Sequence, residues 1–225
     1  MYKLNSALIL CFIGIALYVL SLYIESPNLE LFSRPVIIPS IFYFYLSSIK
    51  GKINIWYAIS ILLYLIGEIL YMISQSEFFI LGLFFFLAPY FLVLYFLGKD
   101  FIYYLKLKKY VINSIALYVI VLLLFSLLYN VMSFNDDSFG IEYNLYIGYA
   151  IALFIMSILT FIIQYNFSSR AIMFMVLMVV CFLVSDVFFV FANKIKGFVI
   201  FEIISVIAQQ FSYLFFTLYF MNRTK

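Results

Sequence analysis

Three carboxylates stand inside long apolar stretches of this chain: Glu68, Asp186 and Glu202. An acidic side chain at the centre of a membrane helix costs about 2.5–3.5 kcal/mol on insertion scales, so such residues usually face a wet cavity or a partner. Two carboxylates in one site can divide acid and base work when their surroundings favour different protonation states. The three acids therefore predict a polar cavity that performs acid–base chemistry or binds a cation.

Polar side chains accompany these acids along the same helical faces. Residues three or four positions apart lie on one side of a helix. The stripes are Tyr64, Glu68, Tyr71 and Gln75; Glu202, Ser205, Gln209 and Ser212 or Tyr213; Ser157, Thr160 and Gln164; and Asp186 with Asn193. Hydrogen bonding between membrane helices also produces such stripes and explains the hydroxyl-bearing ones. The three buried acids, and not the hydroxyl-bearing stripes, favour a functional cavity.

Three basic residues border the predicted acidic layer: Arg34, Lys194 and Lys196. One interpretation pairs them with the three buried acids. A second lets them bind the phosphate of a lipid head group, for which the guanidinium fork of Arg34 is well shaped. A third is that they are ordinary interfacial bases, and the sequence leaves all three interpretations open.

The composition indicates what surrounds these groups. The 225 residues are 68% hydrophobic and 10% charged, with a net charge of +3 and no histidine. A soluble domain is roughly 45–50% apolar and roughly 25% charged, so soluble enzymes and nucleic-acid binders are excluded. The missing histidine excludes histidine-ligated haem, histidine-bearing zinc sites and a Ser-His-Asp triad. Cys11 and Cys181 lie in apolar stretches and predict no disulfide, and we expect neither a metal nor a cofactor.

Continuous apolar runs predict an all-α membrane protein. A helix needs about 20 apolar residues to cross roughly 30 Å of hydrocarbon, whereas the strands of membrane barrels alternate apolar and polar residues. Eight such runs lie at about 4–24, 35–49, 53–73, 78–97, 110–132, 143–164, 168–191 and 197–220. The second run begins at Arg34-Pro35, with the proline in the first helical turn. We therefore expect residues 1–225 to form a single eight-span transmembrane domain.

Lysine and arginine are distributed unevenly between alternate loops, which predicts the orientation of the bundle. Ten of the 13 fall on the side of the termini: Lys3, Lys50, Lys52, Lys99, Lys106, Lys108, Lys109, Arg170, Arg223 and Lys225. Only Arg34, Lys194 and Lys196 fall on the other side. Both termini are therefore expected in the cytoplasm, with the protein in the cell membrane.

The positions of the acids predict a common depth and a repeat. Glu68 and Asp186 lie about five residues before the outer ends of their runs, and Glu202 lies about five residues after the start of its run, so each is roughly 8 Å below the outer boundary. Residues 65–70 and 183–188 also parallel each other, in the third and seventh runs. Two parallel four-helix repeats would explain this, and chance similarity between apolar helices is the alternative.

Short motifs surround these acids: Gly67-Glu68 is followed by Phe79, Gly82 and Phe86, Ser185-Asp186 is followed by Ala208-Gln209, and Arg34-Pro35 opens the second run. The set resembles the YhhN family of eight-span membrane proteins, over spans two to four and six to eight. That family carries a Gly-Asp pair, a short loop and a Gly-x-x-x-Phe run ending in Ala-His, then Ser-Asp and Ala-Gln segments, with Lys-Pro in the second span.

This chain departs from the family pattern at three places. Glu68 replaces an aspartate, and Tyr90, preceded by Pro89, stands where the family has its histidine. The family's tyrosine before Ala-Gln has no match unless Tyr213 substitutes for it. Gln210 is an alternative register for Gln209.

The resemblance implies a lysoplasmalogenase, a hydrolase of lipid metabolism that splits the vinyl ether bond of lysoplasmalogen-type lysophospholipids into a fatty aldehyde and a glycerophospho-base. Such cleavage requires an acid that protonates carbon and an anion and base that stabilise the cation and direct water. The implied catalytic residues are Glu68 and Asp186 as the acid–base pair, with Tyr90 and Gln209 orienting water. Arg34 would lie near the phosphate, and Tyr64, Tyr71 and Glu202 would complete the substrate site.

Two non-enzymatic alternatives are compatible with the same residues. In a membrane transporter or lipid-binding protein the acids would bind a cation or carry protons. A structural subunit of a larger complex would have no ligand. A retinal-type photoreceptor is disfavoured, because no lysine lies within a predicted span.

Overall fold

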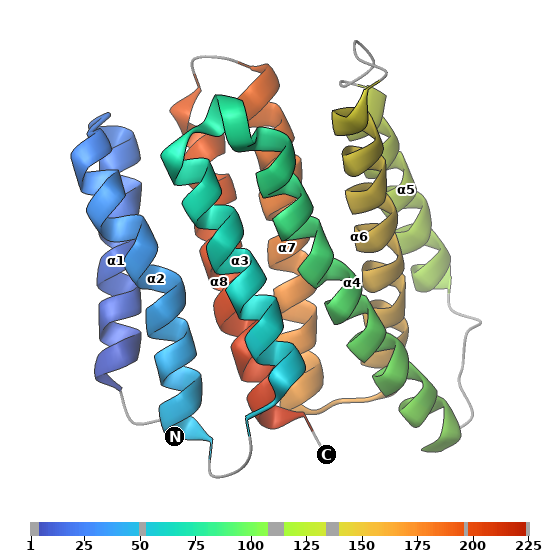
Figure 1. Cartoon of the computed structure of the whole chain (residues 1–225). Helices are drawn as coiled ribbons and strands as arrows, with labels where there is room; N and C mark the ends of the chain where they lie inside the picture. Colours follow the sequence, from blue (N-terminus) through green and yellow to red (C-terminus); the bar gives the residue numbers. More distant parts are fainter. Residues whose placement is uncertain (1–4, 50–52, 108–114, 134–139, 196–197, 224–225) are drawn as a thin grey trace.

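The computed structural model describes residues 5–49, 53–107, 115–133, 140–195 and 198–223 (Figure 1). Within these ranges the chain forms the helices α1 (Ser6–Tyr23), α2 (Pro27–Ser48), α3 (Ile55–Ile73), α4 (Gln75–Leu107), α5 (Ile115–Ser133), α6 (Ile141–Asn166), α7 (Arg170–Lys194) and α8 (Val199–Asn222). The predicted all-α membrane fold is confirmed. Its division into two parallel repeats stays a prediction.

Seven of the described helices, α1–α4 and α6–α8, are long and apolar enough to cross a membrane. Half or less of the most apolar window of each is buried inside the bundle, and large apolar side chains such as Phe84, Leu122 and Tyr129 face outward. A soluble protein rarely exposes so much continuous apolar surface, so this chain is a multi-pass membrane protein. The fifth predicted span corresponds to α5, which is not one of the seven.

Helix α1 begins and α8 ends at the same end of the bundle (Figure 1), as expected when the described helices are even in number and alternate in direction. Six of the bases that predict a cytoplasmic location for this end fall outside the described residues: Lys3, Lys50, Lys52, Lys108, Lys109 and Lys225. The orientation across the membrane therefore stays a prediction. We call the opposite half of the bundle the distal half.

Helix α2 begins at Pro27, so the expectation that Arg34-Pro35 opens this helix is wrong. Pro27 occupies the first turn, where its missing N–H is not needed. Arg34 then lies inside the helix and bonds to Glu30 one turn earlier, with Nη1 2.9 Å from Oε1. The search for apolar runs left the polar first turns of α2 in a loop. In the structure these turns are helical, because a pair of opposite charges four residues apart stabilises a helix.

A tight turn joins α1 to α2. Glu25 adopts a positive φ of 53°, and the N–H of Ser26 donates to the carbonyl of Ser21 at 2.9 Å. A helix that ends in a left-handed residue, here Glu25, commonly has this hydrogen bond, which satisfies a carbonyl of the last helical turn. The turn brings the charged first turns of α2 beside the distal end of α1.

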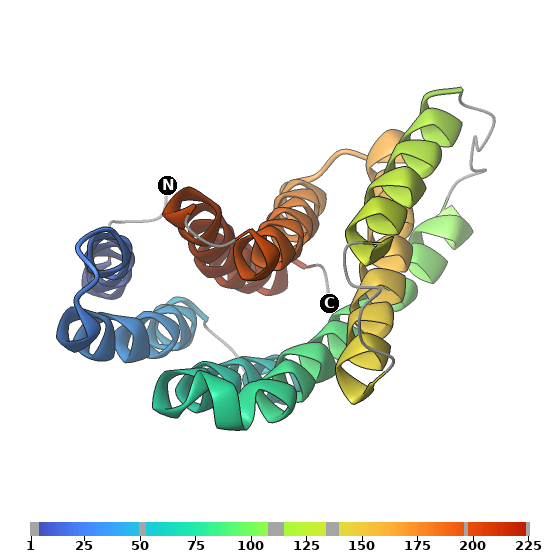
Figure 2. The same ribbon diagram turned by 90° about the horizontal axis from the view of Figure 1, so that it is seen from above.

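Consecutive helices pair as hairpins, and the α7–α8 pair stands between α1–α2 on one side and α5–α6 on the other (Figure 2). The α3–α4 pair lies across from α7–α8. Helix α5 is at the periphery and packs mainly on α6. The hairpins thus enclose a central space.

Two glycines allow α3 and α4 to approach closely at the distal end. A Cβ atom on Gly82 would lie 2.7 Å from the ring of Tyr71, and one on Gly67 would lie 3.0 Å from the ring of Phe86. Contacts this short require a neighbour to move. Small residues at such crossings let membrane helices pack closely, and here they make room for aromatic rings.

Polar side chains join α8 to α3 and α4 in the half nearer the termini. The hydroxyls of Tyr57 and Thr217 are 2.8 Å apart. Asp100 accepts hydrogen bonds from Tyr219 and from Arg223, whose Nη2 is 2.6 Å from Oδ1. These contacts hold α8 against α3 and α4 at this end, where a smaller cavity of about 190 Å³ lies beside Asp100, Tyr219 and Arg223.

Candidate functional site

A cavity of about 750 Å³ lies in the distal half, and each of the eight described helices contributes to its wall. Ligand pockets usually measure roughly 300–1,000 Å³ and combine an apolar lining with a few placed polar groups. This cavity fits that description. Charged residues from α2 and α8 line one side of it, Asp186 of α7 lies on its wall, and aromatic and aliphatic residues line most of the rest.

Arg34 forms the charged side of the cavity together with two glutamates. Its Nε donates to Oε2 of Glu68 at 2.6 Å, and its Nη1 donates to Oε1 of Glu30 at 2.9 Å. The guanidinium also lies 5.3 Å from the centre of the Tyr18 ring, a cation–π distance. One guanidinium thus bonds to two carboxyl groups from different helices.

Glu68 lies behind Arg34 rather than on the cavity wall. It is 4% exposed and is not one of the residues that line the cavity. Its second oxygen, Oε1, accepts hydrogen bonds from Tyr213 at 3.3 Å and from Gln210 at 3.4 Å. The carboxylate therefore connects α2, α3 and α8 through the hydrogen bonds that a buried charge requires.

Asp186 has a different environment. It lines the cavity, and its oxygens accept a hydrogen bond from the hydroxyl of Tyr90 at 3.1 and 3.3 Å. Tyr90 comes from α4 and also lines the cavity. No lysine or arginine in the described part of the chain pairs with Asp186. This carboxyl is therefore free of any such ion pair, unlike that of Glu68.

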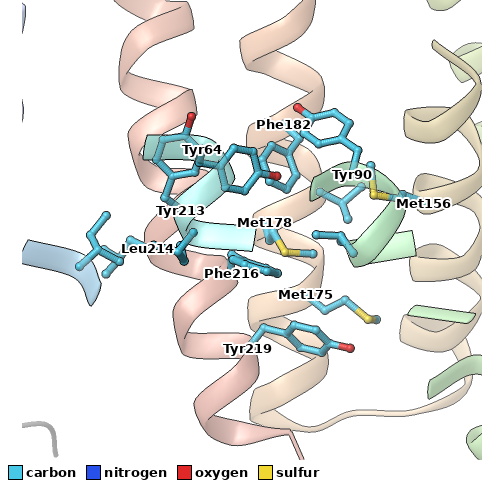
Figure 3. Close-up of a cluster of buried hydrophobic side chains, with 14 of the residues drawn as sticks. Tyr64, Tyr90, Met156, Met175, Met178, Phe182, Tyr213, Leu214, Phe216 and Tyr219 are labelled. Carbon is cyan, nitrogen blue, oxygen red and sulfur yellow. The ribbon is translucent and has the colours of Figure 1, made fainter. Parts of the chain in front are cut away.

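Aromatic rings connect the two acids (Figure 3). The rings of Tyr213 and Tyr64 are 4.6 Å apart, those of Tyr64 and Phe182 are 6.2 Å apart, and those of Phe182 and Tyr90 are 4.7 Å apart. The hydroxyl of Tyr64 is buried and has no hydrogen-bond partner among the described residues. Tyr64 thus lies between the hydroxyl that contacts Glu68 and the one that contacts Asp186.

Glu202 lies at the exposed edge of the cavity, near the start of α8. Below it Ser205 donates to the carbonyl of Ser185 at 2.9 Å, which joins α8 to α7. Glu202 lies three residues after the start of α8. Glu68 lies five residues before the end of α3, and Asp186 lies eight residues before the end of α7. At 1.5 Å per residue the acids are staggered from about 5 to 12 Å below the helix ends, so the expected common depth is only approximate.

The structure brings most of the predicted site residues to this one cavity. The lining residues among them are Asp186, Tyr90, Gln209, Arg34, Tyr64, Tyr71 and Glu202, and Glu68 is joined to them through Arg34. Gln209 donates to the hydroxyl of Tyr213 at 2.8 Å, whereas Gln210 contacts Glu68. The side chain of Lys194 and all of Lys196 lie outside the described residues.

Sequence reasoning missed several residues of the site. Glu30 binds Arg34, and Tyr149 of α6 lines the cavity while it donates to the carbonyl of Leu83 at 2.7 Å. The spacing of Glu30 and Arg34 by four residues was a usable signal, since that spacing places opposite charges together on a helix. Tyr149 carried no such signal, because tyrosine is frequent throughout this sequence.

Comparison with family models, with curated proteins and with solved structures finds no match to this chain.

Proposed function

We propose that this protein hydrolyses the vinyl ether bond of a lysoplasmalogen-type lysophospholipid in the distal cavity. The observation that carries the proposal is the position of Asp186 on the wall of a cavity large enough for a ligand, held by Tyr90 and free of any described ion pair. Further support comes from Arg34, which brings a guanidinium to the charged side of the same cavity. The resemblance to the YhhN family supplies the reaction.

Vinyl ether hydrolysis needs a proton delivered to carbon and then a water molecule. The carboxyl of Asp186 transfers its proton to the vinyl carbon that is not bonded to oxygen, which gives an oxocarbenium ion that the new carboxylate stabilises. Water adds to the cationic carbon and returns a proton to Asp186. The resulting hemiacetal then breaks its bond to the glycerol oxygen, which takes up the proton that the hemiacetal hydroxyl loses, and releases a fatty aldehyde and an alcohol. General acid–base catalysis of this kind contributes about 10²–10⁴-fold to a rate.

The remaining residues have supporting roles in this proposal. Tyr90 orients the carboxyl of Asp186 through its hydroxyl. Arg34 donates to the phosphate through the guanidinium N–H groups that bond to neither Glu68 nor Glu30, and Glu68 is a positioning residue, because its contact with Arg34 Nε fixes the guanidinium. The acid–base pair expected from the sequence is therefore replaced by one carboxyl that acts twice. Gln209, on the cavity wall, is available to direct water.

The test is aldehyde release by the purified protein from a lysoplasmalogen in mixed micelles. We expect activity in the unmodified protein and a loss of at least about 100-fold in Asp186→Asn. The matched control is Glu77→Gln, which neutralises an exposed acid of α4 outside the cavity and should retain full activity. Absence of aldehyde release, or full activity in folded Asp186→Asn, would contradict the proposal.

A second candidate is transport of a cation, favoured by the excess of carboxylates. Glu30, Asp186 and Glu202 line the cavity, and Arg34 is the single base among the lining residues that the structure describes. Intramembrane acids of this kind often mark ion pathways. Proton-coupled uptake into proteoliposomes that is abolished by Asp186→Asn, without aldehyde release, would support transport instead of hydrolysis.

A further inference from the structure

The walls of the distal cavity differ from one side to the other. The side formed by α2 and α8 carries Glu30, Arg34 and Glu202, and Asn28 and Gln209 add neutral polar groups there. The side formed by α4, α5, α6 and α7 is mainly apolar: beside the phenylalanines and tyrosines of these helices it carries the aliphatic residues Leu83, Leu128, Ala150, Leu153, Val187 and Val190. We call the second side the apolar arm. A cavity with charge at one end and hydrocarbon at the other matches an amphiphile, not a uniformly polar solute.

We infer that the apolar arm binds the single hydrocarbon chain of the substrate, with the head group toward α2 and α8; this inference rests on the proposed function. In a lysoplasmalogen the vinyl ether joins the glycerol of the head group to the chain. A residue that acts on this bond must therefore stand between a polar site and an apolar one. Asp186 and Val187 are consecutive residues of α7 that both line the cavity, and Arg34 lines it from α2. On this inference, Asp186 therefore stands at the junction of the two sides.

The side chains of the arm face the inside of the bundle. Leu83, Leu153, Val187 and Val190 are all buried. An alkyl chain placed against aliphatic side chains gains dispersion contacts, and apolar cavities bind hydrocarbon ligands. The arm therefore suits an alkyl chain better than a polar, water-soluble ligand.

Helix α5 marks the far end of the arm. Leu128 of α5 lines the cavity, and its neighbour Leu127 packs with Val187 and Val190 of α7. Helix α5 lies at the edge of the bundle, on the side away from α1 and α2 (Figure 2). The end of the chain should therefore lie beside α5, and the space that α5 leaves at this point should limit the chain length that the protein accepts.

The test is photocrosslinking with two saturated alkyl-ether lysophospholipids, which have no vinyl ether to hydrolyse. One probe carries a diazirine at the end of its chain, and the other carries it on the head group. We expect the chain probe to label peptides of α5, α6 and α7 and the head-group probe to label α2 and α8, with both signals competed by unlabelled lysophospholipid. Labelling of α2 or α8 by the chain probe, or labelling that is not competed, would overturn the inference.

A pair of variants on α6 tests the arm by a second measurement. Ala150→Leu adds methylene groups inside the arm, and Ile151→Phe enlarges the adjacent residue, which is exposed on the outer surface. Displacing two methylenes of the chain should weaken competition by a long-chain ligand about tenfold in Ala150→Leu, with little effect on a shorter ligand. Ile151→Phe should behave as the unmodified protein. Equal effects on both chain lengths would contradict the inference.

The two proposals fail in distinguishable ways. If the probes label as expected but no aldehyde is released from a lysoplasmalogen, the chain site stands and hydrolysis is wrong. If aldehyde is released but the chain probe labels the charged side, hydrolysis stands and the apolar arm is wrong.

Discussion

Arg34 and Glu68 form an ion pair of 2.6 Å between α2 and α3, and both side chains are largely withdrawn from solvent. The pair places a guanidinium on the wall of the distal cavity while its principal carboxylate partner stays behind the wall. Taking two charges out of water is costly, and hydrogen bonds to the remaining atoms offset that cost. Glu30, Tyr213 and Gln210 supply those hydrogen bonds.

Breaking this pair from one side should destabilise the bundle. Glu68→Gln leaves the guanidinium of Arg34 with Glu30 alone, and loss of one partner of a buried pair costs about 3–5 kcal/mol. We expect a lower thermal midpoint in detergent, measured by loss of monodisperse protein on heating. Removing both charges in Arg34→Met/Glu68→Gln should recover most of the loss. A double variant as unstable as the sum of its two single variants would show that the residues do not interact.

The hydroxyl of Tyr90 should matter for activity more than for stability. Tyr90→Phe removes the hydrogen bond to Asp186 and leaves the ring in contact with Phe182. If Tyr90 orients the proposed acid, aldehyde release should fall about tenfold to a hundredfold while the thermal midpoint changes little. Tyr95→Phe, which changes an exposed tyrosine on the same helix, is the control. Unchanged activity in Tyr90→Phe would remove Tyr90 from the mechanism.

Gly82 should tolerate no larger residue. In Gly82→Ala the new Cβ would lie 2.7 Å from the ring of Tyr71, whereas in Gly98→Ala it would meet nothing within 4 Å. Forcing extra atoms into a packed site costs about 1–3 kcal/mol. We expect a clear fall in thermal midpoint for Gly82→Ala, and none for Gly98→Ala. Because Tyr71 lines the cavity, ligand affinity should fall as well.

The contact between Asp100 and Arg223 should stabilise the bundle without affecting the cavity. Arg223→Gln removes the charge that Asp100 faces from α8, and we expect a lower thermal midpoint. Competition by lysophospholipid in the crosslinking assay should be unchanged in the folded fraction, because both residues lie in the half nearer the termini. Loss of competition would show that this contact also shapes the distal cavity.

The orientation is testable by thiol labelling in intact cells. In a background without Cys11 and Cys181, Glu25→Cys lies on the distal α1–α2 turn and Lys106→Cys lies at the opposite end of α4. The distribution of lysine and arginine predicts that a membrane-impermeant reagent labels the first from outside and reaches the second only after permeabilisation. The reverse labelling pattern would show that the bundle has the opposite orientation in the membrane.

The sequence by itself determined the membrane character, the approximate positions of the helices and most of the polar residues of the cavity. Apolar runs long enough to span a bilayer define helices whatever their neighbours, and spacing by three or four collected Tyr64 and Tyr71 on one face of α3. Acids near the same ends of α3, α7 and α8 had to meet in one half of any bundle with alternating directions. For this reason the predicted residues lie around a single cavity although the order of packing was unknown.

Only the tertiary structure decided which charges meet. Arg34 could have paired with any of the three acids, and the crossing of α2 and α3 brings it to Glu68. That pairing leaves Asp186 with Tyr90 and gives the two acids different roles. Such choices depend on distances between helices far apart in the chain, and the periodicity of a single helix contains no information about them.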